Sequence, residues 1–344
     1  MSFRPLRALR ILAAVAVLGM FAREARADLV WSPDSGWRIE GGALSGLTGD
    51  QGRNALQLMN KARRDEENHS YLGAVRVYTK VCKKYSTSVY APEAFYRIGL
   101  IRFNRRQYYK AFDAFQILLG RYPNSHRYTE VIGYLYQISA ALLNGDTNHA
   151  FGFLPTFRNR ERAVQYEETI LADAPYSDFA PLCLMEAAEA ESFLHNPDLA
   201  IDELDKLVNT YPQSVLAPEA YLRLAEAHAS QVEGPYYDQA ETNEAITYST
   251  DFTILFPTDK RIGDAAGELD KMKRVLAMSK IKIGDFYFYK RDNYPAARVF
   301  YNEAITSYPD SSIAEVARKR LNSVEIKANA AAQGRPPKKH FLFF

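Results

Sequence analysis

Apolar residues recur along most of the chain at steps of three and four positions, the spacing that places them on one face of an α-helix. The alternation typical of half-buried strands is nearly absent. This pattern predicts an all-α fold. The expected helices form six pairs, 50–66 with 70–84, 88–104 with 107–120, 125–143 with 158–173, 178–194 with 197–210, 215–230 with 236–255, and 262–290 with 294–307, followed by a last helix at about 311–330.

Related turn segments close the predicted helix pairs. The closing residues Pro175 and Pro212 are 37 residues apart, as are Ser86 and Pro123. Two of the repeated segments, APEAFYRIGLIRF and APEAYLRLAEAHA, also agree closely in sequence. A recurring period of this length indicates a repeat architecture rather than a single compact core.

Small residues predict how the two helices of each pair pack. In the second unit the pattern is carried by Gly99, Ala111, Phe115, Leu118 and Pro123. The same intervals start at Ala62 and at Ala188. Small side chains let two antiparallel helices approach closely, and the closing proline cannot continue a helix. The spacing is typical of tetratricopeptide repeats, so we predict a right-handed superhelical array of about six hairpins over residues 53–330, ending in a capping helix.

The first 27 residues have the features of a secretory signal. Arginines at the start precede the eleven-residue apolar stretch Ile11 to Phe21, and Ala25-Arg26-Ala27 offers small residues for cleavage after Ala27. The apolar stretch is too short to span a bilayer. An uncleaved amphipathic segment is the alternative. We therefore expect a mature protein that is secreted across a membrane.

The segments that flank the repeats carry no clear periodicity. Residues 28–52, which include two tryptophans and many glycines, are expected to form an irregular lead-in. Residues 331–344 are expected to form a flexible basic and aromatic tail. The apolar residues up to Phe344 are too few for a membrane-spanning strand, and they could dock in a groove of the protein or on a membrane surface.

Composition narrows the function classes. Hydrophobic residues make up 47% of the chain and charged residues 24%, as in ordinary globular proteins. A formal net charge of +2 does not suggest a nucleic-acid partner. The only cysteines, Cys82 and Cys183, are too few for a disulfide framework, although one bridge between them stays possible. Neither lies near the end of the apolar stretch, where a lipid would be attached.

Catalytic motifs are missing from the chain. The sequence contains no HExxH, CxxC, GxxxxGK[ST], GxGxxG or GxSxG. Ser279 and Lys282 fit an SxxK spacing, but they lie in a predicted repeat helix without the accompanying motifs. The six histidines are scattered, and none pairs with another at metal-ligand spacing. We predict that the protein is not an enzyme and that it holds no cofactor or metal.

Repeat arrays of this kind bind extended peptides or partner helices on the surface formed by the first helix of each pair. Counting from the small residue of each hairpin predicts that surface. It should be formed by Met59, Arg63, Tyr96, Leu100, Phe103, Met185 and Glu189. Tyr96 and Phe103 are the sharpest candidates, because exposed aromatic side chains on one helical face can bind peptide side chains. The alternative is that these rings pack against a neighbouring unit.

From Tyr211 to about Glu325 the chain resembles the BamD family, tetratricopeptide proteins that help to fold β-barrels into the bacterial outer membrane. The resemblance rests on Tyr237-Asp238-Gln239 with the helix that follows, and on MKRVLAMSKIKIGDFYFYKRDNYPAARVFYNEAITSYPDS. The chain departs from the family in lacking a cysteine to acylate and in its number of repeats. The partner surface that the resemblance implies consists of Arg274, Lys280, Lys290 and Arg291.

These observations predict a non-enzymatic scaffold at the periplasmic face of the outer membrane. The resemblance implies two kinds of partner, a β-barrel assembly protein with periplasmic domains and unfolded outer-membrane protein clients. One alternative keeps the fold and resembles the YbgF/CpoB proteins, which contact the Tol-Pal system and peptidoglycan synthesis. A further alternative is a peptidoglycan-acting hydrolase, which would need a pair of catalytic groups that the sequence does not show.

Overall fold

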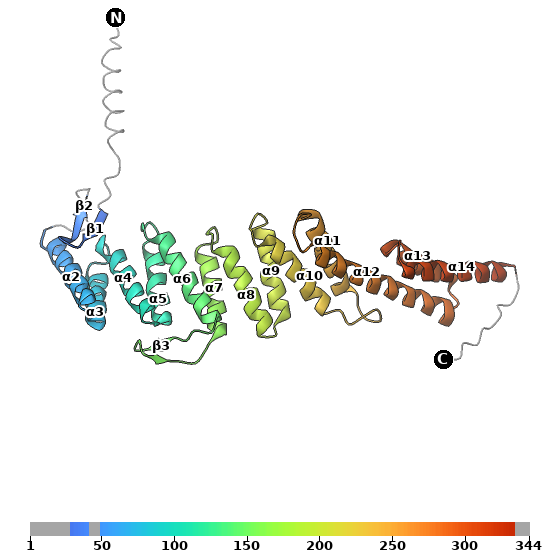
Figure 1. Ribbon diagram of the computed structural model, residues 1–344, viewed down its shortest axis with the longest axis horizontal. Coiled ribbons are helices and arrows are strands. Elements are labelled where there is room, and N and C mark those ends of the chain that lie inside the picture. The colour runs from blue at the N-terminus through green and yellow to red at the C-terminus, as the bar shows by residue number, and fades with distance from the viewer. Residues whose placement is uncertain (1–27, 41–48, 334–344) are drawn as a thin grey trace, which may run out of the picture. The chain divides into compact units, whose positions relative to one another are not determined.

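The computed structural model describes residues 28–40 and 49–333. The chain divides into two compact units, with the boundary after Ala180. Each unit consists almost entirely of helices that pack side by side in chain order (Figure 1). The prediction of an all-α helical repeat array is therefore confirmed. The predicted signal, residues 1–27, and residues 334–344 of the predicted tail lie outside the described residues.

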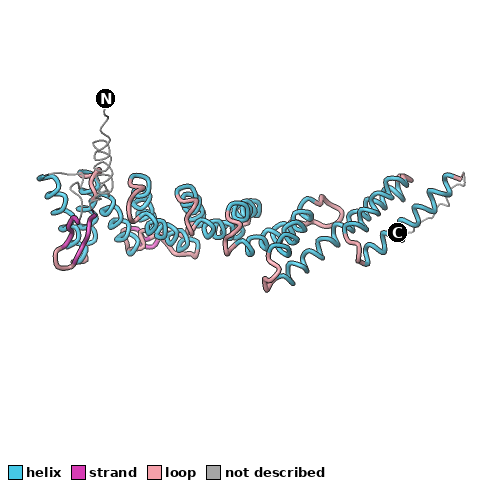
Figure 2. The backbone as a smooth tube through the Cα atoms, turned by 90° about the horizontal axis from the view of Figure 1, so that it is seen from above, coloured by secondary structure: helices cyan, strands magenta, loops and turns pink. Residues whose placement is uncertain are grey.

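The first unit begins with a strand pair and continues as helical hairpins. Its elements are β1 Asp28–Ser32, β2 Gly36–Glu40, α2 Gly49–Glu67, α3 Tyr71–Lys84, α4 Tyr90–Asn104, α5 Tyr108–Arg121, α6 Tyr128–Leu143, β3 His149–Ala150, β4 Leu154–Pro155 and α7 Arg160–Asp173. The helix α8 Ala180–Phe193 starts at the boundary between the units. Figure 2 shows the strands, in magenta, as two short hairpins among the helices.

The second unit is helical throughout its described residues. After α8 its elements are α9 Pro197–Thr210, α10 Ala217–Ser230, α11 Ala240–Leu255, α12 Ile262–Asp285, the π-helical turn η1 Phe286–Lys290, α13 Tyr294–Ser307 and α14 Ser312–Ala332. The predicted helices agree with the observed ones to within a few residues at most ends. The largest differences are at α12, where the last five residues of the predicted 262–290 form η1, and at α11, where residues 236–239 belong to the preceding loop.

The prediction of an irregular lead-in over residues 28–52 is wrong for most of that segment. β1 and β2 form an antiparallel hairpin in which Trp31 lies opposite Trp37, and α2 already begins at Gly49. Gly36 has a φ of +69° and joins the turn to β2. The hairpin is held by non-local contacts, because Trp37 is buried and its backbone N–H donates to Asn60 Oδ1 at 2.7 Å. Those contacts are not visible in the local sequence pattern.

The small residues pack as the spacing predicts. A Cβ atom added to Gly99 would overlap the ring of Phe115, so only glycine lets α4 and α5 approach this closely. Gly284 has the same relation to Tyr301, with a built Cβ 2.6 Å from Cε1 of that ring. The interval from Gly284 to Ala297 is one residue longer than that from Gly99 to Ala111. The turn η1 lies within this interval and accommodates the extra residue, as π-helical turns do.

The turn inside four of the hairpins is also repeated. In each of them, the second residue after the end of the hairpin's first helix has a left-handed backbone conformation. These residues are His69, Arg106, His195 and Asp292. None is a glycine, although glycine is the residue that adopts this conformation without steric cost.

An ion pair joins successive hairpins at the repeated APEA segment. In the first unit Arg127, just before α6, donates from Nε to Glu93 Oε2 of α4 at 3.3 Å. In the second unit Arg261, just before α12, donates to Glu219 of α10 in the same way. The two glutamates occupy the same place in the repeat, so the contact between neighbouring hairpins is part of the repeated unit.

Candidate functional site

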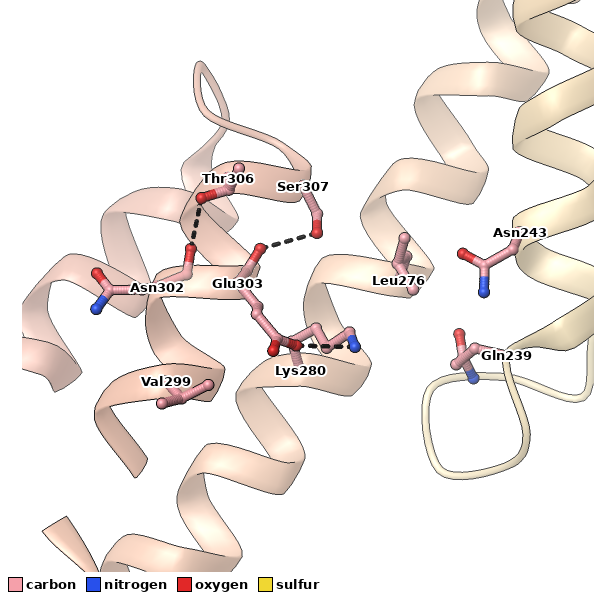
Figure 3. Close-up of a pocket in the computed structure, with 9 residues that line it drawn as sticks. All are labelled: Gln239, Asn243, Leu276, Lys280, Val299, Asn302, Glu303, Thr306 and Ser307. Atoms are coloured by element: carbon pink, nitrogen blue, oxygen red, sulfur yellow. Dashed lines mark hydrogen bonds and ion pairs between the residues drawn. The ribbon is translucent and has the colours of Figure 1, made fainter. Parts of the chain in front are cut away.

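A groove of the second unit lies between α11, α12 and α13, and we call it the α11–α13 groove. Its volume is about 610 Å³. It is lined by Gln239, Asn243, Leu276, Lys280, Val299, Asn302, Glu303, Thr306 and Ser307. Figure 3 shows Gln239 and Asn243 on one side, the residues of α13 on the other, and Leu276 and Lys280 of α12 between them.

The polar side chains of the α11–α13 groove are partly paired within it. Lys280 Nζ lies 2.9 Å from Glu303 Oε2, and both side chains are partly exposed (Figure 3). Gln239 donates from Nε2 to the carbonyl oxygens of Gly234 and Tyr237, each at 2.9 Å. The amide oxygen of Gln239 is buried and accepts no hydrogen bond. The bonds that this amide donates therefore hold the loop that precedes α11 at the edge of the groove.

Apolar groups complete the α11–α13 groove. Val299 is 53% exposed on α13, and Leu276 is half-buried on α12. Asn243 and Asn302 are exposed and carry amide groups that can both donate and accept. An apolar floor with amide side chains around it is suited to an extended polypeptide, whose backbone needs donors and acceptors while its side chains need apolar contacts.

The basic residues predicted as a partner surface do not come together as one patch. Of the four, Lys280 alone lines the α11–α13 groove. Arg274 is exposed and lies 3.5 Å from Asp270 one turn earlier in α12. Arg291 packs over the ring of Phe286 at 5.3 Å, and Lys290 is exposed at the end of η1. The turn η1 thus separates the last two from the groove-facing side of α12.

The first unit contains a smaller cavity next to the β1–β2 hairpin, and we call it the α4 cavity. Its volume is about 380 Å³. It is lined by Leu29, Val30, Trp31, Trp37, Arg63, Glu93, Arg97, His126 and Arg127. Arg63 lies over the Trp31 ring at 4.3 Å, and Arg97 donates to both carboxylate oxygens of Glu66.

Glu93 is the most unusual residue of the α4 cavity. Its side chain is 3% exposed, and its Oε1 has no hydrogen-bond partner. Burial raises the pKa of this carboxyl to about 7, against the opposing effect of Arg127. Nearby Glu130 and Glu66 raise it further. The carboxyl is therefore partly protonated at neutral pH.

Three of the residues predicted on an exposed peptide-binding surface are buried, and for them the prediction is wrong. Met59 is fully buried between helices, and Met185 is 7% exposed. Tyr96 is 4% exposed because its ring packs against Phe115 and Tyr134 and its hydroxyl donates to Glu130. The alternative reading, packing against a neighbouring unit, is correct for Tyr96.

The remaining four predicted residues are more accessible but already engaged. Leu100 is half-buried, and the half-buried Phe103 ring contacts Tyr134 at 5.3 Å between centroids. Arg63 lies 3.0 Å from Glu67 and contacts Trp31. Glu189 is exposed and lies 2.6 Å from Arg223 of α10. Whether they bind a partner stays a prediction.

Most residues of the α11–α13 groove were not predicted. Gln239 and the exposed residues of α13 carry no motif, and they meet only because three helices pack around them. The available signals were the two segments of the family resemblance, Tyr237-Asp238-Gln239 and residues 272–311, and of the groove residues only Lys280 was predicted as part of a partner surface.

Residues 28–40 and 49–333 contain no group of three His, Cys, Asp or Glu side chains placed to hold a metal ion. Ser279 of the SxxK spacing is buried in α12. Cys82 and Cys183 are both buried, and burial raises the pKa of the Cys82 thiol to about 12. Among the described helices, none is both long and apolar enough to cross a membrane.

Comparison with known families identifies the second half of the chain. The model of the YfiO family, described as outer membrane lipoprotein, matches residues 158–335 and so includes the whole α11–α13 groove. The chain belongs to the YfiO family. A tetratricopeptide repeat model matches residues 93–125, which cover most of α4 and all of α5. The predicted resemblance to BamD is thereby confirmed.

Individual relatives of this YfiO-family chain are distant. The outer membrane protein assembly factor BamD of Caulobacter vibrioides is 25% identical over 129 residues, which are 38% of this chain and 42% of that protein. The match thus spans less than half of the relative's length. A tetratricopeptide repeat protein from Bacteroides fragilis is 13% identical, with 78% of this chain and 98% of that chain covered and a TM-score of 0.36. A tetratricopeptide repeat protein from Parabacteroides merdae is also 13% identical, with coverages of 79% and 99% and a TM-score of 0.31.

Proposed function

We propose that this YfiO-family protein is a non-enzymatic scaffold for the assembly of β-barrel proteins into the outer membrane. The observation that carries the proposal is that the family match at residues 158–335 contains the α11–α13 groove. The protein acts at the periplasmic face of the outer membrane after cleavage of its signal at Ala27. Its function is binding, with no covalent bond made or broken.

In this proposal the α11–α13 groove holds an extended segment of a partner protein. Leu276 and Val299 contact apolar side chains of that segment, and the exposed amide groups of Asn243 and Asn302 pair with its backbone. The Lys280–Glu303 pair can separate to contact charges of either sign. The partners are a β-barrel assembly protein with periplasmic domains and unfolded outer-membrane clients.

The test is affinity purification of the tagged protein from its own envelope, followed by identification of the proteins that co-purify. We expect a large β-barrel protein with periplasmic domains. Val299→Arg should lower its recovery at least about tenfold, because a charge replaces an apolar contact in the groove. Ile326→Arg is the matched control, since Ile326 is also exposed but lies outside the groove.

Recovery of Tol-Pal or peptidoglycan-synthesis proteins instead would favour the YbgF/CpoB alternative and overturn the assembly role. Equal recovery by the Val299→Arg and unmodified proteins would keep the partner but reject the groove as its binding site.

A further inference from the structure

The β3–β4 hairpin of the first unit exposes a group of apolar side chains, and we call residues 150–157 the hairpin tip. Phe151 is 68% exposed, Phe153 73% and Leu154 54%. Phe157, which follows β4, is 95% exposed. Such a concentration of exposed apolar side chains marks a site of contact with a partner or a membrane.

The hairpin is held in place by the α4–α5 turn. The backbone N–H of His149 donates to the Arg106 carbonyl at 2.7 Å, and that of Tyr109 donates to Asn148 Oδ1 at 3.2 Å. Arg105 donates from Nη2 to the Phe151 carbonyl at 3.0 Å. Figure 1 shows the hairpin reaching back from the end of α6 towards this turn. The exposed rings are therefore presented by a fixed support.

The backbone of the hairpin tip satisfies much of its own hydrogen bonding. Ala150 pairs with Leu154, and the N–H groups of Gly152 and Phe153 donate back to His149 and Ala150 at 3.2 and 3.3 Å. A segment with few unpaired backbone groups can leave water without the large cost of burying them. The phenylalanine and leucine side chains carry no polar atoms that would oppose this.

Arginines surround the apolar tip. Arg158 and Arg162 follow it and are exposed, and Arg105 and Arg106 lie at the turn beneath it. Arg162 lies over the Tyr109 ring at 4.3 Å, so its position is fixed. Asp146 is the acidic side chain closest to Arg106, at 3.6 Å. The rim of the tip is thus mostly positive.

We propose that the hairpin tip inserts into the headgroup region of an anionic lipid bilayer, with its four apolar side chains below the phosphates and the arginines among them. Phenylalanine and leucine side chains insert at the boundary between headgroups and acyl chains, and basic side chains are attracted to anionic headgroups. A fluid bilayer can surround a projecting tip of separate rings, and the positive rim complements its charge. The inference does not depend on the partner proposed for the α11–α13 groove.

The test is flotation with vesicles of phosphatidylethanolamine and phosphatidylglycerol, and with vesicles of phosphatidylcholine alone. The full chain is measured beside a version that starts at Asp28, so that binding by the hairpin tip can be distinguished from binding by the apolar stretch of residues 11–21. We expect both to bind the anionic vesicles. The variant Phe151→Ser/Phe153→Ser/Phe157→Ser in the version from Asp28 should bind at least about tenfold more weakly. Arg158→Gln should weaken binding to anionic vesicles about fivefold.

Insertion itself is measured with tryptophan substitutions. Phe157→Trp should be quenched by vesicles with brominated acyl chains. Tyr176→Trp should not be quenched, because Tyr176 lies on a different loop of the same unit. It is a matched control, since its side chain is 97% exposed. The proposal is overturned if the version from Asp28 does not float, if the triple variant floats equally well, or if Phe157→Trp is not quenched. Capture of a protein by the hairpin tip without vesicle binding would assign the tip to a protein partner instead.

Discussion

At the scale of single residues, burial decides how the same ion pair behaves. Glu93 and Glu219 occupy equivalent places in the two APEA segments, and each accepts a hydrogen bond from the arginine that precedes the next hairpin. Burial raises the pKa of Glu93, whereas hydrogen bonds from Arg223 and Arg261 lower the pKa of Glu219, whose side chain is 36% exposed. The repeat therefore keeps the contact, while the burial of the glutamate decides whether its pKa is raised or lowered.

The raised pKa of Glu93 makes stability depend on pH. The folded protein holds a proton at about pH 7 that the unfolded chain loses near pH 4.5, so stability should fall as the pH rises from about 5 to 7. The contribution is about 3 kcal/mol at most. Glu93→Gln cannot ionise and should remove this decrease, which urea unfolding at pH 5 and pH 7 would measure. Glu66, whose pKa burial also raises, should leave a smaller decrease in the same direction.

Glu168→Gln is the matched control, because Glu168 is an exposed glutamate of the same unit and is not among the groups that shift the pKa of Glu93. Its pH dependence should resemble that of the unmodified protein. An unchanged pH dependence in Glu93→Gln would contradict the assignment.

At the scale of helices and hairpins, close approach at glycine and the repeated turn define the unit. Gly99 with Phe115 and Gly284 with Tyr301 show that one packing device recurs even where η1 adds a residue. The repeated spacing between the small residues of each hairpin therefore reflects where its two helices touch. Because these contacts join helices that are neighbours along the chain, the bounds of the helices could be predicted from the sequence to within a few residues.

Gly99→Ala should destabilise the protein. The added methyl overlaps the Phe115 ring, and overpacking of this kind costs about 1–3 kcal/mol. Gly120→Ala, in α5 with open space around it, should instead stabilise by up to about 1 kcal/mol through helix propensity. Thermal unfolding of the two variants should shift in opposite directions. A gain in stability for Gly99→Ala would contradict the packing.

His195→Gly should stabilise the hairpin of α8 and α9. His195 has a φ of 64° and an exposed side chain, so glycine removes the left-handed strain, which is about 1 kcal/mol. A rise in the melting temperature of about 2–4 °C would agree with this. His195→Val should lower it, since a branched side chain fits this conformation worst.

At the scale of the whole molecule, periodicity predicted the helical repeats but not the surfaces. The tetratricopeptide pattern and the BamD resemblance were both visible in the sequence, because each depends on residues close together along the chain. The β1–β2 hairpin was missed since Trp37 is held by Asn60 of α2. Tyr96 was expected to be exposed, but contacts with α5 and α6 bury it. The exposure of a side chain depends on how neighbouring helices pack, and the repeat spacing alone does not predict that packing.

The central claim is that the α11–α13 groove binds a protein of the outer-membrane assembly machinery. The most direct measurement places a photo-crosslinking amino acid at Val299 in the intact envelope and identifies the protein that is captured, with Ile326 as the control position. We expect a crosslink from position 299 to a β-barrel protein with periplasmic domains, and none from position 326. A crosslink to Tol-Pal components, or equal crosslinks from both positions, would contradict it.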